Sequence, residues 1–224
     1  MGFFILWGDN LLVGKVVGIV ALGFYQMAYR IANIPSTEIV NALSPVIFPA
    51  YAKLQNNFEK LKETYLKTFQ LLSWIFFPLG VGIFAISYEF TFLFLGTKWL
   101  PVTPIIQVLV VAGVLRAIVA TSGPLFLALA KPHLDTRLQS LRFFVMTITL
   151  YPFIVWWGLV GAGFSVLLSI FATFIMFLWM VKKLIQCSLG QILWIIFIPC
   201  FSSFMMFLML YILKILFAVN FFTF

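Results

Sequence analysis

Residues 9–55 read DNLLVGKVVGIVALGFYQMAYRIANIPSTEIVNALSPVIFPAYAKLQ. A membrane helix needs about 20 mostly apolar residues, so this stretch is long and apolar enough for two. It nevertheless contains Asp9, Asn10, Lys15 and Arg30. A charge near the centre of a bilayer costs about 2.5–3.5 kcal/mol on insertion scales. A polar cavity or a charged substrate has to offset that cost, so the stretch points to function as well as to fold.

The composition of the whole chain predicts an all-α integral membrane protein. Of its 224 residues, 64% are hydrophobic and 9% are charged, whereas soluble domains are about 45–50% apolar and about 25% charged. A soluble fold of this size cannot hide so much apolar surface. The net charge of +8 does not indicate nucleic-acid binding, because the basic residues lie between hydrophobic runs, as the positive-inside rule predicts. Cys187 and Cys200 lack the spacing of metal ligands.

About seven apolar segments are candidates for membrane spans. The second is short and contains Pro45 and Pro49, so we expect it to be kinked. No signal peptide is expected, because the first apolar run is followed by further membrane segments. The chain, 1–224, is therefore predicted to be a single transmembrane lobe with helices at about 3–33, 37–52, 68–95, 102–130, 138–157, 159–181 and 192–219.

The connection at residues 53–67, KLQNNFEKLKETYLK, has an amphipathic pattern. Leu54, Phe58, Leu61 and Tyr65 recur at helical spacing, and the lysines lie off that stripe. One interpretation is a short amphipathic helix on the cytoplasmic membrane surface. The other is a plain extension of a membrane helix beyond the headgroups.

The basic residues alternate between connections, which predicts the topology. Little beyond Lys98 occupies the linkers after the first, third and fifth segments. The chain is then expected to begin in the cytoplasm and to reverse between residues 33 and 37 on the outer side. The linkers after the second, fourth and sixth segments contain Lys53, Lys60, Lys62, Lys67, Lys131, Arg137, Arg142, Lys182 and Lys183.

The sequence offers little for catalysis. Its single histidine, His133, lies in a short loop near Asp135, an arrangement more typical of a solvated loop than of a site. The run GLVGAG at 158–163 does not have nucleotide-loop spacing and is better explained by a tight turn with close packing. We therefore expect no catalytic residue, no metal site and no cofactor, and we expect that the protein is not an enzyme. Broken apolar helices with a few buried basic groups are typical of a secondary transporter or lipid translocator.

Several short motifs follow one another along nearly the whole chain. Asp9–Gly14 reads D-x-x-x-x-G, and further motifs follow it in order. They are LGFYQMAYRIANIP at 22–35, SPVIFPAYAKLQ at 44–55, FPLGVGIFAISYEF at 77–90, FLGTKW at 94–99, LALAKP at 127–132 and WGLVGAG at 157–163. In this order the motifs resemble the polysaccharide transporter family. They look like its Wzx-type flippases for O-antigen and exopolysaccharide, within the multidrug/oligosaccharidyl-lipid/polysaccharide exporter superfamily.

The resemblance implies a MATE-like exporter fold, whose members have two lobes around a central cavity. This chain is similar only to the C-terminal half, so a missing N-terminal lobe or partner half is expected, and the isolated half is expected to be inactive. The implied function is translocation of an oligosaccharide linked to undecaprenyl diphosphate across the bacterial inner membrane, by alternating access. A drug/cation antiporter of the same superfamily, a truncated remnant and a membrane interaction subunit remain alternatives.

A diphosphate substrate requires basic groups in a cavity, and sugar hydroxyls require hydrogen-bonding partners. The predicted diphosphate contacts are Lys15, Arg30 and Arg116, and the predicted sugar contacts are Asp9, Asn10, Tyr25 and Gln26. Arg30 could instead snorkel to the outer headgroups, and Lys15 could pair with Asp9. Glu89 is expected to form a structural pair near Lys98, although Asp9 and Glu89 are also candidate protonatable sites.

Overall fold

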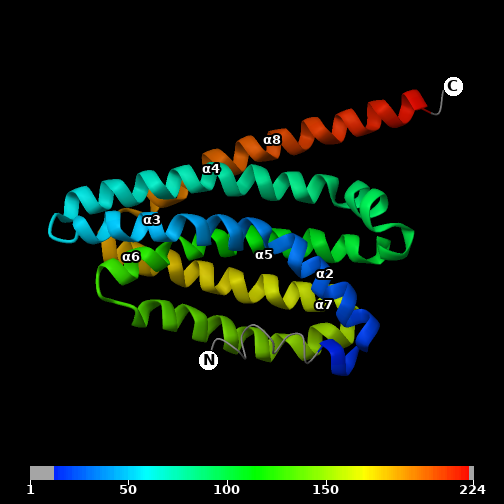
Figure 1. The fold of residues 1–224 in the computed structure, drawn as a ribbon, viewed down its shortest axis with the longest axis horizontal. Helices are drawn as coiled ribbons and strands as arrows, with labels where there is room; N and C mark the ends of the chain where they lie inside the picture. The colour runs from blue at the N-terminus through cyan, green and yellow to red at the C-terminus, as the bar shows by residue number, and fades with distance from the viewer. Residues whose placement is uncertain (1–12, 222–224) are drawn as a thin grey trace.

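The structure, a computed structural model, describes residues 13–221, so the predicted contacts Asp9 and Asn10 lie outside the described residues. This part of the chain is a bundle of long helices (Figure 1), which confirms the all-α membrane class. In chain order the elements are α2 (Ile19–Ile34), η1 (Pro35–Ile39), α3 (Val40–Lys53), α4 (Phe58–Phe90), η2 (Thr91–Leu95), η3 (Thr97–Val102), α5 (Thr103–Ala120), α6 (Ser122–Ala128), α7 (His133–Ile185) and α8 (Leu189–Phe221).

Within the described residues, 4 helical runs are long and apolar enough to cross a membrane. The count of about seven spans therefore stays a prediction. The runs are Phe58–Leu95, Thr97–Ala128, His133–Ile185 and Leu189–Ile215.

The first part of the chain differs from the expected pair of spans. The turn expected between residues 33 and 37 is replaced by η1, a π-helical segment that joins α2 to α3 without a reversal. Pro35 begins this segment, and a proline cannot donate the backbone hydrogen bond of a regular α-helix, so the helix widens locally. A break appears earlier instead, at Gly18, whose φ of 104° ends the helical residues 13–16.

The amphipathic segment is an extension of α4, which is the second of the two interpretations. Asn57 caps the helix by accepting a hydrogen bond from the Lys60 backbone N–H at 3.2 Å. From there α4 runs without interruption to Phe90. Leu61 and Tyr65 are fully buried against other helices. The apolar stripe therefore packs on protein rather than on the membrane surface.

The run α7 contains two antiparallel halves joined at Gly158 (Figure 1). Gly158 has φ 58° and ψ −136°, a conformation that a glycine adopts without strain. A Cβ at Gly161 would collide with the carbonyl of Phe153, so the returning half passes too close for any side chain. The tight-turn interpretation of residues 158–163 is confirmed.

The basic linkers gather at one end of the bundle. The connections at 54–57, 129–132 and 186–188 lie together at this basic end, whereas the turns at Gly96 and Gly158 lie at the other (Figure 1). Lys62 Nζ donates to the carbonyl of Gln186 at 3.2 Å and so joins two of these regions. Arg142 differs from the other basic residues of α7, because it is only 8% exposed.

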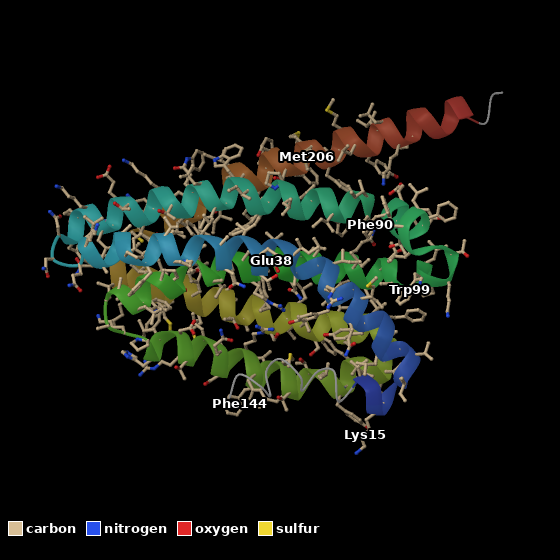
Figure 2. The ribbon with its side chains drawn as sticks, in the orientation of Figure 1. Lys15, Glu38, Phe90, Trp99, Phe144 and Met206 are labelled. Atoms are coloured by element: carbon tan, nitrogen blue, oxygen red, sulfur yellow. The ribbon has the colours of Figure 1, made fainter. Side chains whose placement is uncertain are left out.

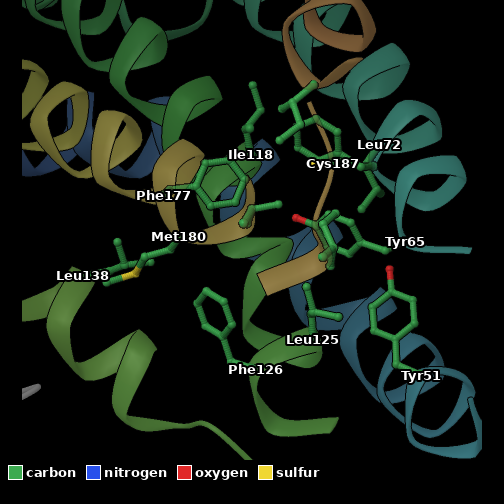
Figure 3. Close-up of a cluster of buried hydrophobic side chains, with 14 of the residues drawn as sticks. Tyr51, Tyr65, Leu72, Ile118, Leu125, Phe126, Leu138, Phe177, Met180 and Cys187 are labelled. Atoms are coloured by element: carbon green, nitrogen blue, oxygen red, sulfur yellow. The ribbon is translucent and has the colours of Figure 1, made fainter. Parts of the chain in front are cut away.

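Two apolar cores hold the helices together. The core toward the basic end includes a row of aromatic rings from α3, α4 and α7 (Figure 3). Tyr51 and Tyr65 have ring centroids 6.0 Å apart, and Phe69 and Phe177 are 6.1 Å apart. The second core packs α2 against α5 and α7, and it contains Tyr25, Ile106 and Leu150 among others. The second core fixes the position of the face described next.

The last helix, α8, packs mainly along α4. Near its far end Lys214 Nζ pairs with Glu89 Oε1 at 2.8 Å and also donates to the carbonyl of Ala85. Glu89 therefore forms a structural pair, as expected, but its partner is Lys214 rather than Lys98. The sequence separation of 125 residues explains why local spacing did not reveal this partner.

Candidate functional site

One face of the run α2–η1–α3 is both uncovered and polar. Gln26, Arg30, Thr37, Glu38 and Asn41 are exposed along it. Hydrocarbon does not accommodate such a set of polar and charged groups cheaply. This face must therefore border water or another polar protein surface.

The opposite face of α2 is held tightly against α5. A Cβ added to Gly113 would lie 2.5 Å from the carbonyl oxygen of Ala32, so the two backbones touch directly. Ala28 and Ala32 are fully buried at the same contact. Small residues let helices approach closely in membranes. The close contact fixes the rotation of α2 and therefore determines which side chains face outward.

A hollow of about 580 Å³ opens on the polar face. Glu38 lies near the middle of the bundle and Trp99 lies toward the end away from the basic linkers, so the hollow extends between those levels (Figure 2). The Trp99 ring packs edge-on against Phe24 with centroids 5.2 Å apart. The hollow is lined by Gly23, Gln26, Met27, Tyr29, Arg30, Asn33, Ile34, Thr37, Glu38 and Trp99.

Arg116 of α5 contacts two of the residues that line the hollow. Its Nη1 donates to Tyr29 Oη at 2.8 Å and to Asn33 Oδ1 at 2.7 Å. The guanidinium carbon lies 5.1 Å from the centroid of the Tyr29 ring, within the range of a cation–π contact. Asn33 is itself held by a bond from its Nδ2 to the Tyr29 carbonyl at 2.7 Å. These contacts hold the cation in a fixed position at the hollow.

The Arg116 guanidinium retains hydrogen-bonding capacity. Its Nε is buried and has no hydrogen-bond partner among the described residues. Arginine carries five N–H donors, and Tyr29 and Asn33 engage only Nη1. A planar guanidinium that is held beside a polar hollow is suited to an anion such as a phosphate.

The hollow itself contains charges of both signs. Arg30 and Glu38 both line it, and both are exposed. The ion pairs found in the described part of the chain are Lys67–Glu63 and Lys214–Glu89, and neither reaches the hollow. Together with Arg116, the ionisable groups around the hollow have a positive balance.

The structure brings together only some of the predicted contacts. Gln26 and Arg30 line the hollow, and Arg116 lies against it. Tyr25 is fully buried in the core, with its ring 5.9 Å from Tyr29. Lys15 is exposed on the far side of the break at Gly18 and away from the hollow (Figure 2). Lys15 lies apart from the other predicted contacts because the helix is broken at Gly18.

Sequence reasoning missed Asn33, Thr37, Glu38 and Trp99. Glu38 carried a signal, because it is an acidic residue within an apolar stretch just after Pro35. Asn33 lies four residues after Tyr29, the spacing that puts both beside one partner on a helix. The sequence gives no signal that Trp99 belongs to the hollow, since only the folded chain brings it beside α2. No group of metal-ligating side chains occurs among the described residues.

An apolar helical bundle with a basic hollow on one uncovered polar face is typical of membrane transporters and translocators. Comparison with known proteins supports the resemblance. The sequence profile described as "Polysaccharide biosynthesis protein" matches residues 1–104. The chain is thus similar to polysaccharide biosynthesis proteins, and the resemblance inferred from its motifs is confirmed.

Individual relatives agree with this assignment. An uncharacterized membrane protein in the cps region of Klebsiella pneumoniae is 32% identical over 157 residues, which are 70% of this chain and 32% of that protein. The lipopolysaccharide biosynthesis protein WzxC of Escherichia coli (strain K12) is 28% identical over 200 residues, which are 87% of this chain and 40% of that protein. The chain therefore spans less than half the length of these relatives.

A solved structure shares the fold. The inward closed conformation of the lipid II flippase MurJ superposes with a TM-score of 0.73 at 15% identity, over 93% of this chain and 48% of that chain. At this identity the similarity concerns the fold alone.

Proposed function

We propose that this chain forms the C-terminal lobe of a Wzx-type flippase, which moves a polyprenyl-diphosphate-linked oligosaccharide across the bacterial inner membrane. The hollow on α2–η1–α3 is the substrate site of this lobe. Its uncovered polar face meets a first lobe across a central cavity. The mechanism is alternating access, with the two lobes rocking about the site between them.

The Arg116–Tyr29–Asn33 contact beside the hollow supports this proposal most directly. Arg116 and Arg30 attract the diphosphate and replace part of its water. Gln26 and Thr37 have hydrogen-bonding groups at the same hollow, and these suit sugar hydroxyls. Trp99 offers an aromatic face at one end of the hollow. The polyprenyl tail stays in the lipid, so the hollow has to hold only the polar head.

A binding measurement tests the site. The 224-residue chain is placed in nanodiscs and titrated with a fluorescent oligosaccharide on undecaprenyl diphosphate. Arg30→Gln and Arg116→Gln should each weaken binding about tenfold or more, because hydrogen bonds to charged groups contribute about 1.5–3 kcal/mol. Lys15→Gln and Lys60→Gln remove the same charge at exposed positions that do not line the hollow, and should change binding less than about twofold. Equal losses in all four variants would refute the site.

A cation antiporter is the second candidate function, and Glu38 is the observation that favours it. A carboxylate in a polar hollow at this depth is suited to an organic cation or to a coupling proton. Tetraphenylphosphonium binding that depends on Glu38, together with no binding of the diphosphate lipid, would favour the antiporter. The positive balance around the hollow favours the diphosphate.

The role of a first lobe has its own test. Proteoliposomes that contain the chain alone should not translocate the labelled lipid, since alternating access needs two lobes. Addition of a first lobe from a related transporter should allow translocation, which moves the labelled head group inside the vesicles and protects it from reagents added outside. Translocation by the chain alone would overturn the two-lobe proposal without affecting the binding result.

A further inference from the structure

A second hollow, of about 480 Å³, lies at the basic end of the bundle. It opens where the beginning of α7, the end of α7 and the start of α4 come together. Its polar lining consists of Lys131, His133, Arg137, Lys183 and Gln186. It shares no residue with the hollow on α2, so the two sites are distinct.

Three cations of this hollow have no carboxylate partner in the described part of the chain. Lys131, Arg137 and Lys183 are exposed, and the ion pairs found there involve other lysines. Asp135 lies on the same helical turn as Arg137 but does not line the hollow. The hollow therefore concentrates uncompensated positive charge in a concave site, which attracts an anion more strongly than a flat surface does.

The remaining wall is apolar and aromatic. Trp179 is 60% exposed, and Lys183 Nζ lies 5.4 Å from the centroid of its ring. Leu134, Met180 and Leu184 line the hollow beside it. Tryptophan is enriched at the level of lipid headgroups, where one side of the ring is apolar and the other is wet. A soluble anion has no apolar part to pack against this wall, whereas a lipid carries both a phosphate and an apolar part.

We propose that this hollow binds an anionic phospholipid. Lys131, Arg137 and Lys183 contact the headgroup phosphate, and Trp179 with Leu184 contacts the glycerol and the first part of the acyl chains. Basic pockets between membrane helices are known to suit such headgroups. Because the pocket includes both ends of α7, an occupied pocket ties together two distant segments; Arg137 and Lys183, for example, are 46 residues apart.

Native mass spectrometry of the 224-residue chain tests the proposal. The chain is titrated with phosphatidylglycerol and, separately, with zwitterionic phosphatidylethanolamine. The triple variant Lys131→Gln, Arg137→Gln, Lys183→Gln should bind phosphatidylglycerol at least about tenfold more weakly. The matched triple Lys53→Gln, Lys60→Gln, Lys67→Gln removes the same charge from the same end outside the pocket, and should lose less than about twofold.

Trp179→Leu provides a second readout that leaves every charge in place. This variant should bind phosphatidylglycerol more weakly. Its binding of inorganic phosphate should equal that of the unchanged chain. Equal losses in the two triple variants would show a general surface charge and overturn the proposal. Equal binding of both lipids would overturn it too, and so would displacement of the lipid by millimolar inorganic phosphate, which would assign the pocket to a free anion.

Discussion

The run α2–η1–α3 and the helix α8 both leave a long face uncovered, but the two faces have opposite chemistry. On the first, Arg30, Thr37, Glu38 and Asn41 are exposed. On the second, Trp194 is 63% exposed and Met209 is 66% exposed, and the residues between them are mostly apolar. The extent of exposure is therefore uninformative by itself. The chemistry of an uncovered face tells what covers it, which is lipid for α8 and a polar surface or water for α2–η1–α3.

The largest expected effect comes from placing the same charge on each face. Phe204→Lys puts an ammonium near the middle of the apolar face of α8 and should cost about 2.5–3.5 kcal/mol of membrane insertion. Asn41→Lys puts it on the polar face of α3 and should be nearly neutral. The measurement is the carbonate-resistant fraction of each variant. Similar membrane insertion of the two variants would contradict the difference between the two faces, because it would mean that both face the same solvent.

A smaller effect is expected from Asn33→Leu. The change removes the Oδ1 that accepts from Arg116 Nη1, and a hydrogen bond to a charged group contributes about 1.5–3 kcal/mol. Thermal unfolding in detergent should show this loss. Asn41→Leu makes the same chemical change at an exposed position and should alter stability by less than about 0.5 kcal/mol. Equal stability of the two variants would mean that Arg116 is not held at the hollow.

Gly113→Ala tests the contact that orients the polar face. The added Cβ would lie 2.5 Å from the Ala32 carbonyl oxygen, so α2 and α5 must separate, at a cost of about 1–3 kcal/mol. Gly123→Ala is the control, because nothing lies within 4 Å of its Cβ position. That variant should be neutral or stabilising by about 0.5–1 kcal/mol. Both are compared by thermal unfolding, and a neutral Gly113→Ala would contradict the close contact.

The smallest effect is expected for the ion pair between α8 and α4. Lys214 and Glu89 are 40% and 45% exposed at their side chains, so a double-mutant cycle of Lys214→Met and Glu89→Gln should give at most about 1 kcal/mol. A coupling of about 3 kcal/mol or more would place the pair in hydrocarbon. That result would sharpen the comparison by extending the lipid-covered part of α8 to its far end.

Much of the fold followed from local pattern. The apolar runs predicted helices because lipid requires backbone hydrogen bonds to be satisfied within each segment. Glycine at 158 and 161 predicted a tight turn, and the structure has one. The turn expected between residues 33 and 37 was wrong, because the chain has a π-helical segment there that begins at Pro35. A proline removes one hydrogen bond, but whether the helix ends or widens depends on the helices packed around it.

For the site, the sequence alone indicated that Arg30 and Arg116 need polar surroundings, because the cost of a charge in an apolar segment follows from composition. Tertiary structure decided which residues meet: α5 packed on α2 joins Arg116 to Tyr29 and Asn33 across 87 and 83 residues, and the break at Gly18 leaves Lys15 elsewhere. Helical spacing specifies neighbours only within an unbroken helix. The rotation of one helix against another is set by contacts such as Gly113 on Ala32, which are visible only in the folded chain.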